Sequence, residues 1–240
     1  MSSGYSAQPT PTTACHAVTT TIPDLDDPMI LVGRWLDEAV DAAAQPNPNA
    51  MTLATVASDG RASARVVLVK GLDRTRAYAQ FYTNYGSRKA CDLADNAWAA
   101  GVMHWDLLGR QLRFEGPVVK SPAAESDAYF AVRPWRSQLN AWASEQSHTV
   151  ADPTSLEKKA RELAERFGTP DPFGDDNAAD GAAITRPDFW GGYRFWFAAV
   201  ELWHSGRDRF HERVRYQRSL DAADAHSFCA GSWSHFHLQP

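Results

Sequence analysis

The sequence predicts an α+β protein built on an antiparallel sheet or barrel. Strand-like stretches follow one another through short turns, and the helical patterns come in groups instead of alternating with single strands. The chain also contains neither G-x-G-x-x-G nor a Walker-type loop, the phosphate-binding motifs of folds with a parallel sheet. A nucleotide-like cofactor would therefore bind without the crevice of a doubly wound fold.

The first half of the chain supplies one long helix and most of the strands. Asp27 and Pro28 form a helix start signal, after which apolar residues recur at helical spacing. Alternating or β-branched stretches predict strands over residues 51–57, 62–69, 77–83, 97–105 and 110–119. The turn signal at 58–60 makes the first two strands a hairpin, and a short helix is expected from Ser87 to about Asn96.

The second half begins with helices and returns to strands. Pro122 and Pro153 each follow a capping residue, which predicts helices over 122–133 and 153–167. Residues 168–188 are acidic, rich in Gly and Pro, and aperiodic, so we expect a long surface loop. Strands are predicted over residues 193–203, 209–218 and 232–238. We divide the chain into a mobile N-terminal tail, residues 1–26, and a single domain, residues 27–240.

Composition restricts the possible partners. The net charge is −5, which argues against a nucleic-acid-binding surface because such surfaces usually make a domain basic. No stretch of 18 apolar residues exists, and the N-terminus lacks the pattern of a secretory signal, so we expect no membrane partner. The three cysteines are scattered and match no disulfide framework. A cytoplasmic protein is the expectation.

The stretch from Tyr82 to Lys89 carries the clearest chemical signal. A predicted strand ends there, and the helix that begins at Ser87 has two cations, Arg88 and Lys89, in its first turn. Cations are normally disfavoured at a helix N-terminus, which already carries partial positive charge. Free backbone N–H groups, a hydroxyl and two cations together suit a phosphate. The alternative is a solvated turn whose basic residues have no ligand.

Three other groups of polar residues can be explained either as parts of a binding site or as ordinary surface residues. On a strand, Arg209, His211 and Arg213 would share one face, which suits either an anionic pocket or a solvated edge strand. Arg65 and Lys70 flank a buried strand, but on a regular strand their side chains would point to opposite faces. Both can contact one ligand only if a bulge or a bend at the strand end intervenes. They can equally be charged strand ends that reach solvent.

The third group lies in the helical middle of the chain. Tyr129 and Arg133 are four residues apart on the predicted helix, and Ser137 follows them, which suits a second phosphate site or an ordinary amphipathic helix end. His235 and His237 share a strand face near His226, but no Cys or carboxylate spacing supports a metal site, so we expect none.

Eight stretches, in this order, resemble the pyridoxine/pyridoxamine 5′-phosphate oxidase family of FMN-dependent enzymes. They are PNAMTLATV (48–56), RVVLVKG (65–71), FYTNYGSRKA (81–90), RQLRFEG (110–116), SDAYFAVRPWRSQLNAWASEQS (126–147), FWGGYRF (189–195), ELWHSGRDRFHERVRYQR (201–218) and the closing HLQP. Each stretch alone is modest, but their order along residues 27–240 makes the resemblance specific.

The resemblance implies a fold, an assembly and a reaction. The family fold is an FMN-binding split β-barrel with peripheral helices, which works as a homodimer with two FMN sites at the subunit interface. The implied activity is that of an FMN-dependent oxidase acting on pyridoxine or pyridoxamine 5′-phosphate. Dioxygen is the acceptor, and the products are pyridoxal 5′-phosphate and hydrogen peroxide; the amine substrate also releases ammonia. The implied partners are therefore a phosphorylated pyridine substrate, O2 and a second copy of the chain.

The resemblance also implies a role for individual residues. The positions that match FMN contacts are Arg65, Val66, Val67, Leu68, Val69, Lys70, Tyr82, Thr83, Ser87, Arg88, Lys89, Gln111, Gln146, Ser147, Trp203 and Arg213. The positions that match the substrate-phosphate site are Lys70, Tyr129, Arg133 and Ser137. Arg209 and His211 match residues placed against the pyridine ring and the reacting carbon, and they are the expected catalytic pair.

Several departures from the family pattern keep other functions open. Residues 1–26 contain no Arg, although many family members have an Arg and a Tyr in the N-terminal segment that closes over the substrate. Asn140 stands where Gly is common, and His237 replaces an Arg. A related FMN-dependent oxidase with a cyclic or phenazine-like substrate is one alternative. A non-catalytic module that binds flavin or tetrapyrrole is the other.

Overall fold

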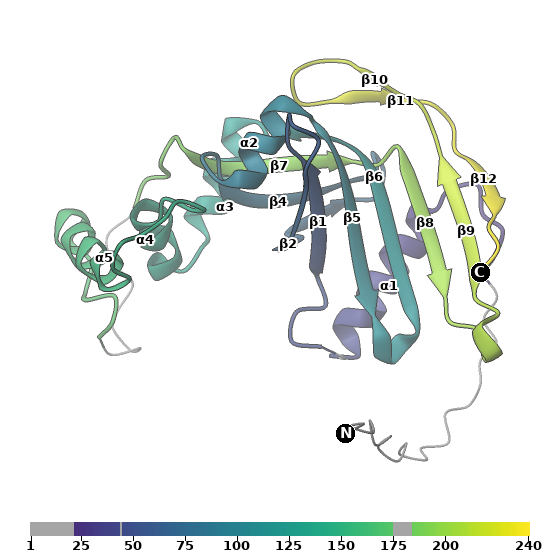
Figure 1. Ribbon diagram of the computed structural model, residues 1–240, viewed down its shortest axis with the longest axis horizontal. Helices are drawn as coiled ribbons and strands as arrows, with labels where there is room; N and C mark the ends of the chain where they lie inside the picture. Colours follow the sequence, from purple (N-terminus) through teal and green to yellow (C-terminus); the bar gives the residue numbers. More distant parts are fainter. Residues whose placement is uncertain (1–21, 44, 175–183) are drawn as a thin grey trace, which may run out of the picture.

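The computed structural model describes residues 22–43, 45–174 and 184–240, and it confirms a mainly β fold with peripheral helices (Figure 1). The predicted tail before residue 22 and the part of the predicted loop from 175 to 183 lie outside the described residues. None of the helices in the described ranges is long and apolar enough to cross a bilayer.

One ten-stranded antiparallel sheet forms the split barrel. Its strands are β1 (Ala50–Val56), β2 (Ala62–Leu68), β3 (Gly71–Asp73), β4 (Tyr78–Asn84), β5 (Trp98–Trp105), β6 (Arg110–Lys120), β7 (Trp190–Trp196), β8 (Ala199–His204), β9 (Glu212–Gln217) and β12 (Ser234–His237). Their order is β12-β9-β8-β6-β5-β1-β2, with β7 joining β6 to β4 and β3 pairing with β4. β10 (Leu220–Ala222) and β11 (Phe228–Ala230) form a separate hairpin.

The long strand β6 connects the two halves of the barrel because it changes partner along its length. Its first half, Arg110 to Glu115, pairs with β8, and its last residues, Val118 to Lys120, pair with β7. Gly116 lies at the change of partner, where a Cβ atom would collide with the backbone of Trp196 and Ala198. Only glycine permits this close approach of two backbones.

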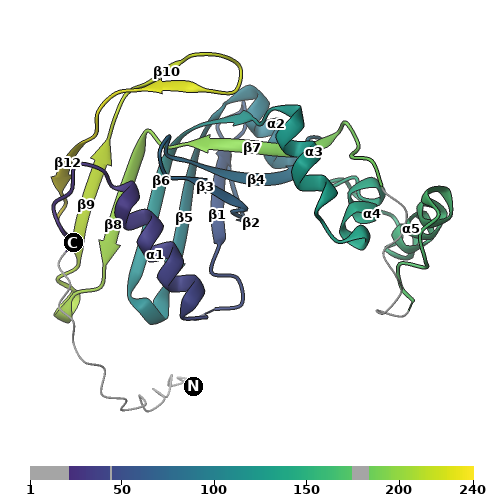
Figure 2. The same cartoon turned by 180° about the vertical axis from the view of Figure 1, so that it is seen from behind.

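The helices cover one face of the sheet and one end of the barrel. They are α1 (Met29–Asp41), α2 (Arg88–Asp95), α3 (Ala123–Ala131), α4 (Trp135–Ala143) and α5 (Thr154–Phe167). α1 crosses the sheet and buries Leu31, Val32 and Trp35 in the main core (Figure 2). In both views α3, α4 and α5 lie at the end of the molecule opposite β8 and β9 (Figures 1 and 2). A smaller core around Phe130, Leu139 and Trp190 holds these helices together.

Three predicted elements differ from the structure in a way that affects the site. The helix predicted over 122–133 ends at Ala131, because Arg133 precedes Pro134 and the residue before a proline is disfavoured in helical conformation. A further helix, α4, follows Pro134. The strand predicted over 193–203 is two strands, β7 and β8, whose junction lies in a continuous apolar run without a turn signal.

The strand predicted over 209–218 begins only at Glu212. A short 3-10 turn, η2 (Arg207–Arg209), precedes it, and Asp208 and Arg209 have positive φ angles of 54° and 67°. The expectation that Arg209, His211 and Arg213 share one strand face is therefore wrong, because Arg209 and His211 precede the strand. Left-handed conformations at two consecutive non-glycine residues are not visible in sequence, and they are found mainly where function needs a strained loop.

Candidate active site

The N-terminus of α2 holds a buried cation without a carboxylate partner. Lys89 is 6% exposed, and its Nζ donates to Thr83 Oγ1 (2.9 Å), Ser87 Oγ (3.0 Å) and Gln146 Oε1 (2.8 Å). Burial, together with the nearby charge of Arg65, lowers the pKa of Lys89 to about 8. Since all three acceptors are neutral, the positive charge of the ammonium is not compensated by any group in the described part of the chain. Such a site favours an anion.

Arg65 reaches the same region from β2. Its guanidinium donates to Leu53 O (3.2 Å), Thr55 Oγ1 (2.7 Å) and Ser63 Oγ (2.7 Å), and it lies 3.7 Å from the Asp92 carboxylate. Burial lowers the pKa of Arg65, an effect that the charge of Asp92 opposes. Arg65 is thus fixed in place by the β1–β2 hairpin and α2, and part of its charge is offset.

Two further cations in this region have exposed side chains. Arg88, in the first turn of α2, has no hydrogen-bond or ion-pair partner among the residues that the structure describes. Lys70 follows the end of β2 at Leu68, so the alternation of a strand no longer applies to it, and its side chain is likewise unpaired within the described ranges. Because the strand ends before Lys70, strand alternation no longer prevents Arg65 and Lys70 from serving one site.

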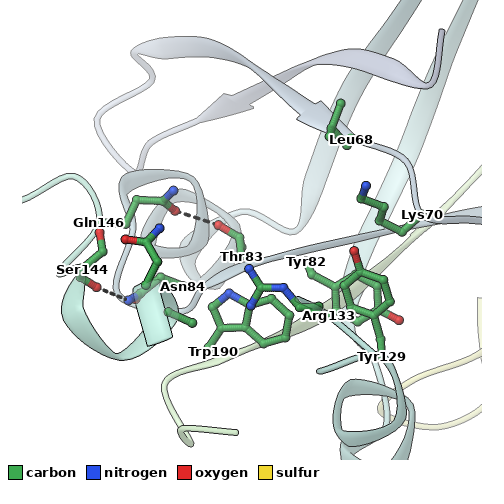
Figure 3. A pocket seen from close by; sticks show the side chains of 12 residues that line it. Leu68, Lys70, Tyr82, Thr83, Asn84, Tyr129, Arg133, Ser144, Gln146 and Trp190 are labelled. Atoms are coloured by element: carbon green, nitrogen blue, oxygen red, sulfur yellow. Dashed lines mark hydrogen bonds between the residues drawn. The ribbon is translucent and has the colours of Figure 1, made fainter. Parts of the chain in front are cut away.

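A cavity of about 260 Å³ lies beside these residues, between β4, α3, α4 and the start of β7 (Figure 3). Its lining residues are Leu68, Lys70, Tyr82, Thr83, Asn84, Tyr129, Arg133, Asn140, Ala141, Ser144, Gln146 and Trp190. Thr83 and Gln146 also bind Lys89, so the cavity and the buried ammonium share two side chains. The lining contains two cations and no Asp or Glu, which makes it suitable for an anion.

The cavity pairs a free guanidinium with stacked aromatic rings. The Arg133 guanidinium lies over the Trp190 ring, 4.5 Å from its centroid, and its buried Nη1 has no hydrogen-bond partner among the residues that the structure describes. Burial lowers the pKa of Arg133. The Tyr82 and Tyr129 rings stack with centroids 3.9 Å apart, and Trp190 lies nearly parallel to both (Figure 3). An anionic group attached to a flat ring would meet complementary surfaces here.

The cavity lining differs in part from the sequence prediction. Ser137, predicted beside Tyr129 and Arg133, is not one of the lining residues. Asn140, one turn further along α4, lines the cavity instead, together with Asn84, Ser144 and Trp190. None of these four was predicted. Helical spacing from Ser137 could have indicated Asn140, but the contribution of Trp190 depends on the packing of β7 against α3.

The remaining predicted cofactor residues differ in exposure. Val66 is 64% exposed on the outer face of β2, whereas Val69 is buried in the core and Val67 packs against it. Val69 can therefore offer a ligand only its backbone. Ser147 is exposed and adopts a positive φ of 76° directly after Gln146.

A second group of predicted residues lies on β6, β8 and β9. The strand register places Gln111, Trp203 and Arg213 directly beside one another across the three strands. The Trp203 ring packs against the His211 ring, with centroids 4.7 Å apart. The three strands thus present an amide, an indole and a guanidinium in one row, and His211 borders it.

The loop from Gly206 to His211 fixes the predicted catalytic pair. The Gly206 N–H donates to His211 Nδ1 (3.3 Å), and a Cβ at Gly206 would collide with the Phe210 carbonyl. A neutral His211 that accepts at Nδ1 carries its proton on Nε2 and can donate from there. Arg209 is exposed and has no hydrogen-bond or ion-pair partner within the described residues. Both groups are therefore available to a ligand.

The two groups of residues do not meet within one chain. The cavity lies beside α3 and α4, and the row on β6, β8 and β9 lies at the other end of the molecule in both views (Figures 1 and 2). Among the described residues, no group of three or more His, Cys, Asp or Glu side chains could hold a metal ion. His235, one of the histidines considered above, is instead paired with Asp24.

Two family models match most of the chain. Residues 36–167 match the model described as pyridoxamine 5′-phosphate oxidase, and residues 190–240 match the pyridoxine 5′-phosphate oxidase C-terminal dimerisation region. Among curated relatives, a pyridoxine/pyridoxamine 5′-phosphate oxidase from Cupriavidus pinatubonensis is 44% identical over 89% of each chain. The enzyme of the same name from Cupriavidus taiwanensis is 47% identical over 80% of this chain and 82% of its own.

Two solved structures share the architecture. PhzG from Burkholderia lata, in complex with tetrahydrophenazine-1-carboxylic acid, has a TM-score of 0.74 and 32% identity, covering 90% of this chain and 94% of that chain. A pyridoxamine 5′-phosphate oxidase-related, FMN binding protein from Nostoc punctiforme has a TM-score of 0.63 and 16% identity, covering 91% of this chain and all of its own, and it supports the fold alone.

Proposed function

The chain belongs to the pyridoxamine 5′-phosphate oxidase family, and we propose that it oxidises pyridoxine or pyridoxamine 5′-phosphate to pyridoxal 5′-phosphate with bound FMN. Dioxygen is the proposed acceptor and hydrogen peroxide the product. The family and the fold support an oxidase with a flavin. The B6 substrate, FMN as the particular flavin and the residue roles are our proposals, as is the single catalytic domain over residues 27–240.

The cavity between α3, α4 and β4 carries the substrate assignment. Lys70, Tyr129 and Arg133 converge on it without any carboxylate in the lining, and Arg133 Nη1 is buried without a hydrogen-bond partner in the described part of the chain. A buried unpaired donor is costly, because it has lost its hydrogen bonds to water. A phosphate would supply the missing acceptor, and the parallel rings of Tyr82 and Tyr129 suit a flat pyridine.

The N-terminus of α2 fits the phosphate of FMN. Lys89 is a buried ammonium with only neutral partners, and Arg65 and Arg88 lie in the same region. When bound, the flavin supplies the redox chemistry by accepting a hydride from the substrate and being reoxidised by dioxygen. The protein's part is to bind, orient and surround the reactants.

We assign the catalytic roles to the loop before β9. Arg209 is unpaired among the described residues, so its guanidinium is free to stabilise negative charge that develops on the substrate. His211, held by the Gly206 N–H at Nδ1, can donate a hydrogen bond or pass a proton from Nε2. The strained backbone at Asp208 and Arg209 fixes both side chains ahead of β9.

We propose that two copies of the chain complete each site. One protomer would contribute the cavity and the Lys89 site, and its partner would contribute Trp203, Arg209, His211 and Arg213. Residues 190–240 match a dimerisation region, and all four of these residues lie within it. Trp203 is on β8 and Arg213 is on β9, and the other two lie in the loop between these strands. The distance between the two groups within one chain supports the same arrangement.

A second candidate substrate is a phenazine-like aromatic acid. The similarity to PhzG, whose structure holds tetrahydrophenazine-1-carboxylic acid, favours it, and the aromatic walls of the cavity are compatible with it. A carboxylate could also accept from Arg133. The three convergent groups Lys70, Tyr129 and Arg133 match the larger charge of a phosphate better, which is why we prefer the B6 substrate.

Oxygen uptake distinguishes these candidates. The purified, FMN-loaded protein is assayed with pyridoxine 5′-phosphate, pyridoxamine 5′-phosphate, their unphosphorylated forms and a dihydrophenazine carboxylic acid. We expect stoichiometric hydrogen peroxide with the two phosphates and little turnover with the unphosphorylated forms. Turnover with the phenazine acid alone would support the second candidate. If FMN binds but none of these compounds is oxidised, both candidate substrates are wrong, and the flavin-binding module without turnover becomes the favoured alternative.

A further inference from the structure

Glu201 on β8 is a buried carboxylate held between two arginines from the neighbouring strands. It is 2% exposed, and its Oε1 accepts from Arg213 Nε (3.0 Å) and Arg213 Nη2 (2.8 Å) on β9. Its Oε2 accepts from Arg113 Nη1 (3.0 Å) on β6. Arg213 Nη1 donates in addition to the Gln239 carbonyl (3.0 Å), so all three nitrogens of the Arg213 guanidinium have a partner.

The pairing of Glu201 with Arg213 is diagonal, and a second ion pair explains why. The strand register places Arg215, not Arg213, directly opposite Glu201. Arg215 instead makes two hydrogen bonds with Glu115 on β6 (2.9 and 2.8 Å), and these bonds lower the pKa of Glu115. Glu201 is thereby left to Arg213, since diagonal neighbours on adjacent strands are within reach of long side chains.

The diagonal contact determines where the Arg213 guanidinium lies. Arg213 is in the row with Trp203 and Gln111, whereas Glu201 is in the next row on the same sheet face. A carboxylate that binds Nε and Nη2 together fixes both the position and the plane of a guanidinium. Without it, a long side chain that is partly exposed would sample several rotamers.

We propose that Glu201 is a positioning residue that fixes Arg213 for flavin binding. This inference rests on the proposed function, because it takes Arg213 to be a cofactor contact. Glu201 touches neither cofactor nor substrate in this scheme, and it acts only through Arg213. Arg113 is the other partner of the same carboxylate, but it is not part of the row with Trp203, so its bond to Glu201 has no such role.

The test compares FMN affinity across four variants of the full-length protein. Flavin-free wild type, Glu201→Gln, Arg213→Gln, the double variant and Arg113→Gln are titrated with FMN, and the dissociation constant is read from fluorescence quenching. The thermal midpoint and the dimer mass of each protein are measured alongside. Arg113→Gln is the matched control, because it removes the second arginine from the same carboxylate.

We expect Glu201→Gln to raise the FMN dissociation constant by about 10- to 100-fold, the range for losing a charge-assisted contact. Arg213→Gln should raise it by a similar factor, the double variant no further, and Arg113→Gln should leave it unchanged. This non-additivity is the signature of one residue acting through another, and a general loss of stability would not produce it.

Three outcomes would overturn the proposal. If Arg213→Gln weakens FMN binding and Glu201→Gln does not, Glu201 has no positioning role, although the proposed function stands. If the two effects add in the double variant, Glu201 acts by another route. If Arg213→Gln itself leaves FMN affinity unchanged, the assignment of Arg213 to the cofactor fails, and the inference fails with it.

A conservative variant covers the case in which Glu201→Gln does not fold. Glu201→Asp keeps the buried charge between the two arginines but withdraws the carboxylate by one methylene. We expect a folded dimer whose FMN dissociation constant lies between those of wild type and Arg213→Gln. An Asp variant that folds and binds FMN as wild type does would also contradict the proposal.

Discussion

Replacing Lys89 by Met should affect stability and cofactor binding in opposite directions. The ammonium is buried among neutral acceptors, and its pKa in the folded protein is about 8, against 10.5 as the ordinary value. Because the folded-state pKa is lowered, the charged ammonium destabilises the flavin-free protein below about pH 8. The unfolded chain binds more protons between pH 8 and 10.5, so stability rises with pH across that window.

The size of both effects follows from the same site. The lowered pKa of Lys89 corresponds to at most about 3 kcal/mol, an upper bound because the adjoining cavity is open to solvent, which screens the charge. We therefore expect Lys89→Met to raise the free energy of unfolding of the flavin-free protein by about 1–2 kcal/mol. Loss of a charge-assisted bond to the FMN phosphate should cost about 1.5–3 kcal/mol, or roughly 10- to 150-fold in affinity.

The pH dependence of FMN binding gives a second readout of the same residue. A phosphate dianion keeps Lys89 charged when FMN is bound, so binding above pH 8 requires proton uptake. The FMN dissociation constant of the wild type should be nearly constant from pH 7 to 7.5. It should then rise roughly 25-fold by pH 9.5, given a pKa of about 8 in the free protein. Lys89→Met should remove this rise.

Fluorescence titration and thermal unfolding of the flavin-free protein measure both effects, with Lys158→Met as the control. Lys158 is 81% exposed on α5, so its replacement should change neither quantity. The reasoning is refuted if Lys89→Met binds FMN as tightly as wild type, or if its pH profile is the same. A variant that is less stable than wild type would show that the ammonium is already compensated in the flavin-free protein.

Three other changes test separate parts of the site. Arg133→Met should raise KM for the phosphorylated substrate about 10- to 100-fold, because it removes a guanidinium that lines the cavity and has an unpaired nitrogen among the described residues. The affinity for FMN should not change. An unchanged KM in steady-state oxygen uptake would contradict this prediction. Arg209→Ala should lower kcat at least about tenfold while the protein stays yellow and dimeric, and near-wild-type turnover would show that Arg209 is not catalytic. Gly116→Ala should lower the free energy of unfolding, measured with urea, by more than about 2 kcal/mol, since the alanine Cβ would collide with the backbone of Trp196. A decrease of less than about 0.5 kcal/mol would contradict the close approach of the two backbones at Gly116.

The antiparallel fold could be predicted because its signals are local. Turn residues at 58–60 and alternation on both sides of them predict the β1–β2 hairpin, and the structure confirms it. The boundary between β7 and β8 was missed because the chain is apolar through both strands, so only their pairing with β4 and β6 separates them. The predicted helix end before Pro134 is within two residues of the end of α3, but α4, which begins directly after Pro134, was not predicted.

The candidate site could be predicted from the sequence where the charge of a side chain conflicts with its surroundings. Lys89 at a helix N-terminus predicted an anion site, and the structure shows its ammonium buried among neutral acceptors. The conformation of Arg209 was not predictable, because positive φ angles at two non-glycine residues depend on the closure of the 206–211 loop. Trp190 and Glu201 were missed because their roles depend on partners distant in sequence.

Mixing two impaired variants, assayed at a substrate concentration well below the wild-type KM, tests the shared site most directly. Arg133→Met alters the cavity, and Arg209→Ala alters the group that we assign to the partner subunit. If each site combines both subunits, a mixed dimer contains one intact site and one doubly altered site. Exchange of equal amounts of the two variants should then restore about a quarter of wild-type turnover, since half of the dimers are mixed and half of their sites are intact. Turnover that stays at the level of the separate variants after exchange, confirmed by mass analysis of tagged chains, would show that each site is built within one subunit.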